Sequence, residues 1–376
     1  MLNQNKSFWK RFAGTLVIFL LISLALIWIG GKQGKRSTTE KQGEYSITGF
    51  AFDTVYTITI YHGGDQKVLD ACVEKCAEYE QIFSRTLESS ELYQLNRLSK
   101  EYEAGNQETI NSLQQEKKLP SYQVLEDGSL EIEVSESLAD LITAGIQYGE
   151  ISQGNFDITI EPVSSQWNFT ADHPVLPESS ALEHALSYVD YRTISLEKQK
   201  LRITRPGTGL DLGGIAKGYI ADQLKQYLVE QGVDSALINL GGNILCIGGK
   251  PDGSDFRIGI QQPFADRNET IATVALQGQS VVSSGIYERY FTDQDTIYHH
   301  ILDSRTGYPR ESDLIAVTIV SDQSVDGDGL STTCFGLGLE AGMRLINQTK
   351  DVTAAFITRD EKLHYADGFR ELLISG

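Results

Sequence analysis

The sequence predicts an α+β fold in which the sheets are mainly antiparallel and helices flank them, preceded by one N-terminal transmembrane helix. Residues 45–61 alternate and are rich in β-branched and aromatic side chains, which is typical of antiparallel strands. Beyond them, strand and helix patterns follow one another irregularly, without the strict β-α-β repetition of a doubly wound sheet. Residues 12–29 form a nearly unbroken apolar run that is long enough to cross a bilayer as one helix.

Three segments place apolar residues at helical spacing and are predicted as helices: residues 66–83, 135–152 and 215–230. A further short helix is expected after Ser89 or Ser90, because a serine at this point can accept a hydrogen bond from the first free backbone N–H groups.

The remaining segments are predicted as strands and loops. Residues 101–128 are rich in Glu, Gln, Asn and Ser and are interpreted as a surface excursion with a hairpin. Strands are expected at residues 196–204, 235–248, 256–262, 271–283 and 314–320.

The chain is divided into a short basic N-terminus (1–11), a transmembrane signal anchor (12–30), a linker (31–44) and one domain (45–376). No small-x-small cleavage site and no cysteine follow the apolar run, which favours an uncleaved anchor over a signal peptide. Basic residues nearly balance across the run, and we expect a single-pass protein of the cell membrane with its domain on the extracytoplasmic side.

The charge of the chain argues against a nucleic-acid partner. Of its 32 basic residues, six lie within residues 1–36, where there is no acid, which leaves 26 basic against 51 acidic residues and a net charge of −25 for the rest. A domain that is this acidic repels nucleic acid and anionic lipid. An anionic ligand would therefore need a local site, with a metal cation.

The segment Asp211-Leu212-Gly213-Gly214-Ile215-Ala216-Lys217 places an acid, two glycines and a lysine at the start of a predicted helix. The glycines allow close approach of a ligand, and the free N–H groups of a helix start attract a phosphate with Lys217 as countercharge. The alternative is a tight turn with a surface lysine, since two glycines before a helix are weak evidence alone.

Two further glycine-rich turns are candidate binding elements. Gly154-Asn155-Phe156-Asp157 ends a predicted helix and opens a strand, and Asn239-Leu240-Gly241-Gly242 connects two apolar strands. Each could lie at a cleft, but Asx-type turn chemistry explains most such Asn–Gly pairs.

Two segments suggest proton transfer and metal binding. His300 lies in a turn-bounded strand with an acid and a base nearby, where it could act as a general base or as a structural histidine. Asp328 and Thr332 share a face at the start of a helix predicted for residues 334–339, and such oxygen ligands suit Mg²⁺. A helix cap is the plainer alternative for Asp328. The neighbouring Asp326 could join the outer shell of the metal or be a solvated loop residue, and the second interpretation is favoured.

From about Gly49 to the C-terminus, the sequence resembles the FAD:protein FMN transferases, also called ApbE-like proteins. Seven motifs carry the resemblance in order: Phe83-Ser84-Arg85-Thr86 through Asn96, Gly154 to Thr159 with Pro162 and Trp167, Asp211 to Lys217, Asn239 to Gly242, Ser283-Ser284-Gly285 with Tyr287, His300 to Pro309, and Asp328 to Thr332. The family usually has Met-Gly-Thr where this chain has Phe52-Asp53-Thr54.

The resemblance implies that the FMN half of FAD is transferred to a Thr or Ser hydroxyl of an acceptor flavoprotein through a phosphoester bond, with release of AMP. It implies catalytic roles for His300 as base and for Asp328. It implies a Mg²⁺ held by the Gly214 carbonyl, Asp328 and Thr332, with Ser331 nearby. The FAD contacts that it implies are Phe52, Thr86, Asn155, Phe156, Asp157, Asp211, Lys217 and Leu302.

The acceptors that the resemblance suggests are flavin-bearing subunits of membrane redox complexes or extracellular reductases. The membrane anchor would hold the enzyme close to such acceptors. Two alternatives stay open. An FAD pyrophosphatase that yields FMN and AMP would use the same residues with water as the nucleophile. A membrane-tethered FAD-binding protein would need the binding turns but neither His300 nor the metal ligands.

Overall fold

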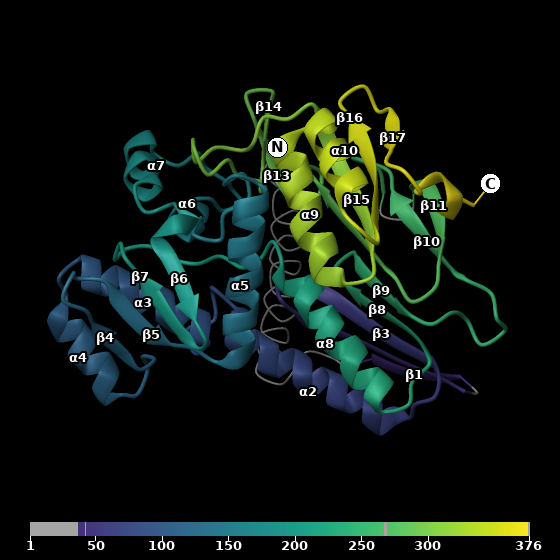
Figure 1. Ribbon diagram of the computed structural model, residues 1–376, viewed down its shortest axis with the longest axis horizontal. Coiled ribbons are helices and arrows are strands. Elements are labelled where there is room, and N and C mark those ends of the chain that lie inside the picture. The colour runs from purple at the N-terminus through teal and green to yellow at the C-terminus, as the bar shows by residue number, and fades with distance from the viewer. Residues whose placement is uncertain (1–36, 42, 267–268, 375–376) are drawn as a thin grey trace, which may run out of the picture.

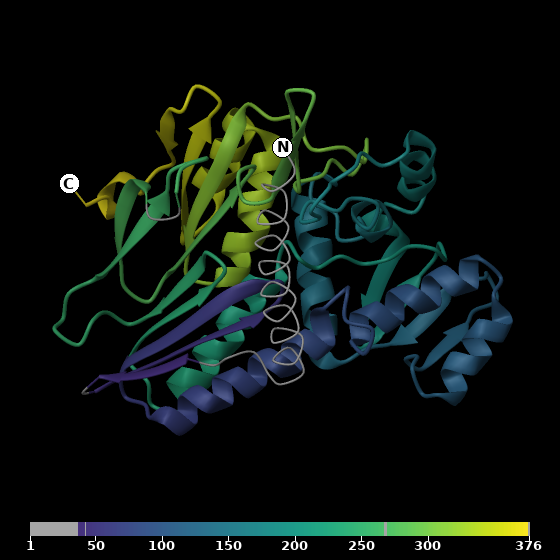
Figure 2. The same ribbon diagram turned by 180° about the vertical axis from the view of Figure 1, so that it is seen from behind.

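The computed structural model describes residues 37–41, 43–266 and 269–374, which form two halves side by side (Figures 1 and 2). The larger half is built on a nine-stranded sheet in the order β1-β2-β3-β8-β9-β12-β15-β16-β17, and every pair in it is antiparallel. The expected α+β class with antiparallel sheets is therefore confirmed. The strands of this sheet are β1 (Ser37–Lys41), β2 (Glu44–Ala51), β3 (Thr54–His62), β8 (Ser235–Leu240), β9 (Asn243–Ile247), β12 (Ser280–Gly285), β15 (Leu314–Ser321), β16 (Val352–Thr358) and β17 (Leu363–Tyr365).

Four helices cover one face of the large sheet (Figure 1). They are α2 (Gln66–Phe83), α8 (Ala216–Glu230), α9 (Ser324–Leu337) and α10 (Leu339–Gln348). The strand pair β10 (Phe256–Gln261) and β11 (Thr270–Leu276) covers part of the other face with an apolar cluster around Phe256. Because β15 lies between both layers, all eight of its residues are buried.

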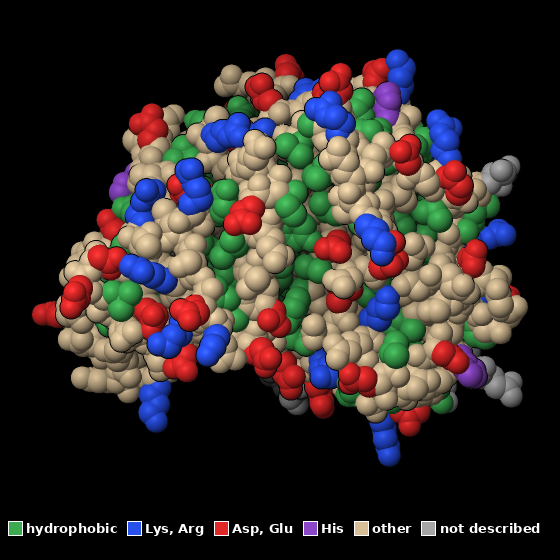
Figure 3. All heavy atoms as spheres, in the orientation of Figure 1, with side chains coloured by type: hydrophobic (Ala, Val, Ile, Leu, Met, Phe, Trp, Pro, Cys, Tyr) green, Lys and Arg blue, Asp and Glu red, His purple; other side chains and the backbone are tan. Residues whose placement is uncertain are grey.

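The smaller half contains a four-stranded antiparallel sheet and most of the remaining helices. Its strands are β4 (Tyr122–Val124), β5 (Leu130–Glu133), β6 (Ile194–Glu197) and β7 (Lys200–Ile203), and its helices are α3 (Glu91–Glu103), α4 (Gln107–Gln115), α5 (Glu136–Ile151), α6 (Glu161–Ser164) and α7 (Ser179–Leu186). Helix α5 contacts α9 and so joins the halves. Figure 3 shows hydrophobic side chains along the seam between these two helices, with acidic and basic side chains interspersed around it.

Local signals account for the helix starts. The hydroxyl of Ser90 accepts a hydrogen bond from the N–H of Tyr93 at 3.2 Å, and Ser135 caps α5 in the same way through Leu138 at 3.4 Å. Helix α2 spans the predicted residues 66–83, and α5 and α8 also match their predictions within a residue at each end.

Three sequence predictions were wrong in detail. The excursion 101–128 does contain a strand that pairs with β5, but it also holds helix α4, which buries Ile110 and Leu113. Residues 196–204 are not one strand, because the chain turns at Lys198 (φ 56°) and β6 pairs with β7. The helix expected at 334–339 begins ten residues earlier, at Ser324.

None of the helices in the described residues is both long and apolar enough to cross a membrane. The predicted transmembrane helix 12–30 lies outside those residues.

Candidate active site

The predicted metal-binding aspartate lies where α8, α9 and the β8–β9 turn meet. Asp328 is 4% exposed, and its carboxylate accepts hydrogen bonds from the backbone N–H of Gly218 at 2.6 Å and from Nδ2 of Asn243 at 3.2 Å. Burial raises the pKa of Asp328, and the positive charge of Lys217 opposes this shift. The fold therefore brings together three of the glycine-rich segments that are separated in the sequence.

A side chain of α8 caps the N-terminus of α9 and so fixes the start of that helix at this junction. The carboxylate of Asp222 in α8 accepts the backbone N–H groups of Ser324 at 2.8 Å and Val325 at 2.9 Å. Since Asp328 is inside α9 and the N-cap is Gln323, the helix-cap alternative for Asp328 is wrong. Asp326 is not a loop residue either: it lies in the first turn of α9 and accepts the hydroxyl of Tyr148 at 2.6 Å.

Gly218 allows the close contact of the two helices. A Cβ at this position would lie 2.3 Å from the carbonyl oxygen of Ser324, which is backbone and cannot move aside as a side chain can. We expect Gly218→Ala to lower the free energy of unfolding by about 1–3 kcal/mol, because α8 and α9 must separate. Urea denaturation would measure this. Gly213→Ala is the control, since its Cβ would approach only the Asp211 carboxylate, at 3.1 Å, and an equal loss there would contradict the explanation.

The hydroxyl groups of α9 face strand β12. The Oγ of Ser284 lies 2.7 Å from Oγ of Ser331 and 3.3 Å from Oγ1 of Thr332. Ser331 also donates to the carbonyl of Asp328 at 2.9 Å. Carboxylate and hydroxyl oxygens are hard ligands of the kind that Mg²⁺ prefers. The described residues hold no cluster of three or more His, Cys, Asp or Glu that could bind a metal ion, so any metal here would depend on hydroxyl and carbonyl oxygens beside Asp328.

His300 follows directly after a short β-hairpin, formed by β13 (Tyr290–Asp293) and β14 (Thr296–His299), instead of lying within one strand as predicted. Its backbone N–H donates to the carbonyl of Arg289 at 3.1 Å, and Nδ1 lies 3.3 Å from the same oxygen. A carbonyl only accepts, so this bond requires the proton on Nδ1 and leaves Nε2 free to take one. Burial lowers the pKa of His300 to about 3, helped by the nearby His299 and Arg289, so the ring is neutral at pH 7.

A lysine and a glutamate complete the electrostatics around Asp328 and His300. Burial raises the pKa of Asp328 and Glu288, and the charge of Lys217 opposes that shift; burial lowers the pKa of His300, and the charge of Lys217 adds to it. Glu288 keeps solvent contact, yet surrounding protein raises the pKa of its carboxyl to about 7. Sequence reasoning missed Glu288 and Arg289, and their position directly after the quoted motif 283–287 was the available signal.

Asp211 belongs to a second polar cluster, on the side of the smaller half. Its carboxylate accepts from Oγ of Ser164 at 2.7 Å and the N–H of Gly213 at 3.0 Å, and it pairs with Nε of Arg85 at 3.2 Å. Thr86, which follows Arg85, is thereby held on the same side. The side chain of Asn96 fixes the preceding residue, Leu210, through both its N–H (2.7 Å) and its carbonyl (2.8 Å).

The turn at 154–157 supports the glycine loop rather than opening a strand. Phe156 is buried, packs edge-on against Tyr148 at 5.9 Å between ring centroids, and lies so close to Gly214 that a Cβ there would be 2.9 Å from its ring. The side-chain oxygen of Asn155 is buried and has no hydrogen-bond partner among the residues that the structure describes, whereas its Nδ2 donates to the carbonyl of Ser152 at 2.7 Å.

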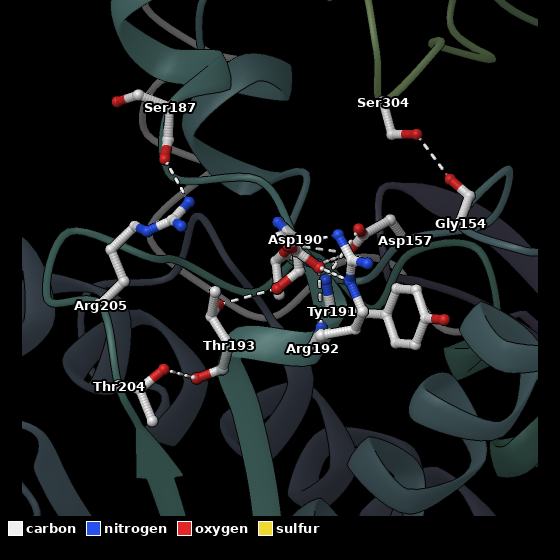
Figure 4. A network of polar contacts seen from close by, with 11 residues as sticks. Gly154, Asp157, Ser187, Asp190, Tyr191, Arg192, Thr193, Thr204, Arg205 and Ser304 are labelled. Carbon is white, nitrogen blue, oxygen red and sulfur yellow. Dashed lines mark hydrogen bonds and ion pairs between the residues drawn. The ribbon is translucent and has the colours of Figure 1, made fainter.

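Asp157 forms an Asx-type turn, which was the alternative to a position at a ligand-binding cleft. Its carboxylate accepts the N–H of Thr159 at 2.8 Å, the Thr159 hydroxyl at 2.6 Å and the N–H of Tyr191 at 2.9 Å (Figure 4). It also lines a cavity of about 360 Å³ with Asp190, Arg192 and Arg305.

Phe52 lies in a turn that the side chain of Arg289 contacts, and Leu302 lies two residues after His300. Phe52 and Asp53 have φ of 57° and 55° and form the two-residue turn between β2 and β3, where Nη2 of Arg289 donates to the carbonyl of Asp53 at 3.1 Å. Leu302 pairs with Pro309 in an isolated bridge and packs on the cluster around Trp167.

Comparisons with known proteins place the chain in one family. The model of the ApbE family matches residues 52–357. An FAD:protein FMN transferase of Klebsiella pneumoniae is 37% identical over 62% of this chain and 72% of its own length, and one of Treponema pallidum is 34% identical over 64% and 71%. The crystal structure of the ApbE protein of Thermotoga maritima superimposes with a TM-score of 0.72 at 25% identity, covering 88% of this chain and all of that one.

Proposed function

This chain belongs to the ApbE family, and from that membership and the site geometry we infer that it is an FAD:protein FMN transferase. It transfers the FMN moiety of FAD to an acceptor protein. The observation that supports the site is the junction at which buried Asp328 contacts the start of α8, the helix that carries Lys217, and the charge of Lys217 acts on both Asp328 and His300. The bond formed is a phosphoester to a Thr or Ser hydroxyl of the acceptor, and AMP leaves.

Asp328 and Thr332, with Ser331 nearby and the Gly214 carbonyl, are the residues proposed to hold Mg²⁺. The fit rests on the donor set, which is entirely oxygen, and on the burial of Asp328 beside a cationic lysine, a setting in which a second cation would favour the ionised carboxylate. Such a metal ion would neutralise charge that develops on the phosphates of FAD.

His300 is proposed to take the proton of the acceptor hydroxyl at Nε2. Three features support this role: the ring is neutral, its other nitrogen is directed to the carbonyl of Arg289, and the backbone of His300 is fixed to that same carbonyl. Lys217 would supply a fixed positive charge for the pyrophosphate, next to the N-terminal N–H groups of α8.

The proposed FAD contacts fall into two groups. Phe52 and Lys217 lie with His300, whereas Thr86 and Asp211 belong to the polar cluster around Arg85. The remaining proposed contacts are Asn155, Phe156, Asp157 and Leu302. Among them, the unpartnered buried oxygen of Asn155 is free to accept a hydrogen bond, while the carboxylate of Asp157 is already used by backbone N–H groups and would contribute through the turn that it fixes.

An intact-mass measurement tests the function. The domain is incubated with FAD, Mg²⁺ and the apo form of a flavoprotein subunit from the same organism. A gain of one FMN on the acceptor supports the transferase. Free FMN and AMP without modified acceptor would support the pyrophosphatase alternative, and bound but uncleaved FAD would support a tethered FAD-binding protein. Omission of Mg²⁺, with a chelator present, tests the metal requirement.

The N-terminal segment is proposed to anchor the enzyme in the cell membrane, with the domain on the extracytoplasmic side, near acceptor subunits of membrane redox complexes or extracellular reductases. Tethering raises the local concentration of enzyme at such acceptors. We expect removal of residues 1–36 to lower FMN attachment to membrane acceptors in cells by about tenfold or more, while transfer to a soluble acceptor in vitro stays unchanged. Equal labelling in cells would contradict the anchor.

A further inference from the structure

Large apolar side chains are exposed on the two hairpins that Arg289 links, β13–β14 and β2–β3. On one side are Tyr290 and Ile297 of the β13–β14 hairpin, each 40% exposed, with Phe264 packed edge-on against Tyr290 at 5.6 Å. On the other side are Phe50 and Val55, which are 68% and 51% exposed. We call these five residues the apolar rim. Exposed apolar side chains that gather at one place, unlike scattered ones, mark interaction sites.

The hairpin is held rigidly by its other face. Side chains alternate along a strand, so Phe291 and Tyr298 point away from Tyr290 and Ile297. These two rings stack on each other at 5.4 Å, and Tyr298 also stacks on Trp167 at 6.0 Å. Trp167 is buried and donates its indole N–H to the carbonyl of Gly307 at 2.9 Å. Because one face is packed, Tyr290 and Ile297 on the other face have a fixed orientation.

Arg289 connects the two sides of the rim to His300. Its carbonyl accepts the backbone N–H of His300 at 3.1 Å, and its guanidinium donates to the carbonyl of Asp53 in the β2–β3 turn at 3.1 Å. Phe50 and Val55 are cross-strand partners one pair away from that turn. Arg289 therefore links the backbone of the proposed base to the hairpin that carries Phe50 and Val55.

We propose that the apolar rim is the docking surface for the acceptor protein, which presents its hydroxyl residue to His300 in an extended segment with apolar side chains on both sides. This proposal rests on the proposed function, because only a transferase needs a protein at this place. A macromolecular acceptor must reach the base from solvent, and both parts of the rim lie on or beside hairpins that Arg289 links to His300.

The strand edges favour an extended partner. Within the described residues, β13 and β14 pair only with each other, so each has one edge without a strand partner. An extended segment can add to such an edge through backbone hydrogen bonds, while alternate side chains contact the apolar face. Backbone pairing would fix the segment relative to His300, and the apolar contacts would supply affinity.

Two charge-introducing variants test the surface: Ile297→Lys on the hairpin and Val55→Lys on the β2–β3 side. The matched control is Val229→Lys, because Val229 is 53% exposed and lies on α8, away from the rim. The acceptor is the flavoprotein subunit that the wild-type enzyme modifies in the mass assay. Initial rates at varied acceptor concentration give KM and kcat, and flavin fluorescence gives the affinity for FAD.

We expect KM for the acceptor to rise about tenfold in both rim variants, with kcat at saturating acceptor and FAD affinity within twofold of wild type. The control should match wild type. Unchanged KM in both rim variants, or an equal loss of FAD affinity, would overturn the docking surface. Failure of the wild-type enzyme to modify any acceptor would instead refute the transferase function itself, so the two failures are distinguishable.

Discussion

Replacing Asp328 by Asn is expected to reduce FMN transfer by about 10²–10³-fold or more while the protein remains folded. Asn has nearly the same volume as Asp, so the buried position stays filled. It can still accept from one donor, either Gly218 N–H or Asn243 Nδ2. The substitution removes the negative charge of the carboxylate, which we propose binds the metal ion. The measurement is the initial rate of FMN attachment by intact mass, with circular dichroism as the check on folding.

Asp326→Asn is the matched control for this prediction. Asp326 lies on the same helix two residues earlier and binds the hydroxyl of Tyr148, and no role at the proposed metal site is assigned to it. We expect its transfer rate to stay within a few-fold of wild type. If Asp326→Asn and Asp328→Asn lost activity equally, the effect would come from α9 as a whole and the specific role of Asp328 would be wrong.

His300→Ala is expected to reduce the transfer rate by about 10²–10⁴-fold, the range for removal of a general base. FAD affinity should change little if the ring acts on the acceptor hydroxyl. His62→Ala is the control, because His62 is two-thirds exposed, pairs with Asp234 and has no role in the proposed site. A large loss of FAD affinity with normal transfer at saturating FAD would show a binding role for His300 instead.

The low pKa of His300 makes a separate prediction for pH. Burial lowers the pKa from 6.5 to about 3, so the neutral ring persists well below pH 6 and its protonation should not limit the rate between pH 5 and 8. Below pH 6.5, the His300 ring of the unfolded chain binds a proton, whereas the ring in the native state stays neutral until pH falls to about 3. The free energy of unfolding that this group contributes is therefore lost progressively as pH falls from 6.5 toward 3. A rate decrease centred near pH 6.5 that vanishes in His300→Gln would contradict the assignment.

Much of the fold could be predicted because its elements are marked by local patterns. Alternation and helical spacing identified β2, β3, α2, α5 and α8, and these patterns survive in the structure because each element buries one face. The order of the glycine-rich and acidic motifs indicated the family, which the family match confirms. Helix α4 was missed because it is largely polar and buries only Ile110 and Leu113.

The start of α9 could not be predicted, since two glycines in its first half are poor helix formers. The structure gives the reason for them: a Cβ at Gly327 would lie 2.6 Å from Val282, and one at Gly329 would lie 2.4 Å from Tyr148. Close packing and the cap from Asp222 therefore outweigh local propensity.

By itself, the sequence determined the α+β class, the positions of most elements and the family, because these follow from periodicity and from motif order along the chain. Only the tertiary structure decided that Asp328 contacts Gly218 and Asn243, and that Arg289 joins the Phe52 turn to His300. Those contacts join residues 11 to 236 positions apart. Sequence spacing carries no information about them, because they are set by how the helices pack on the sheet.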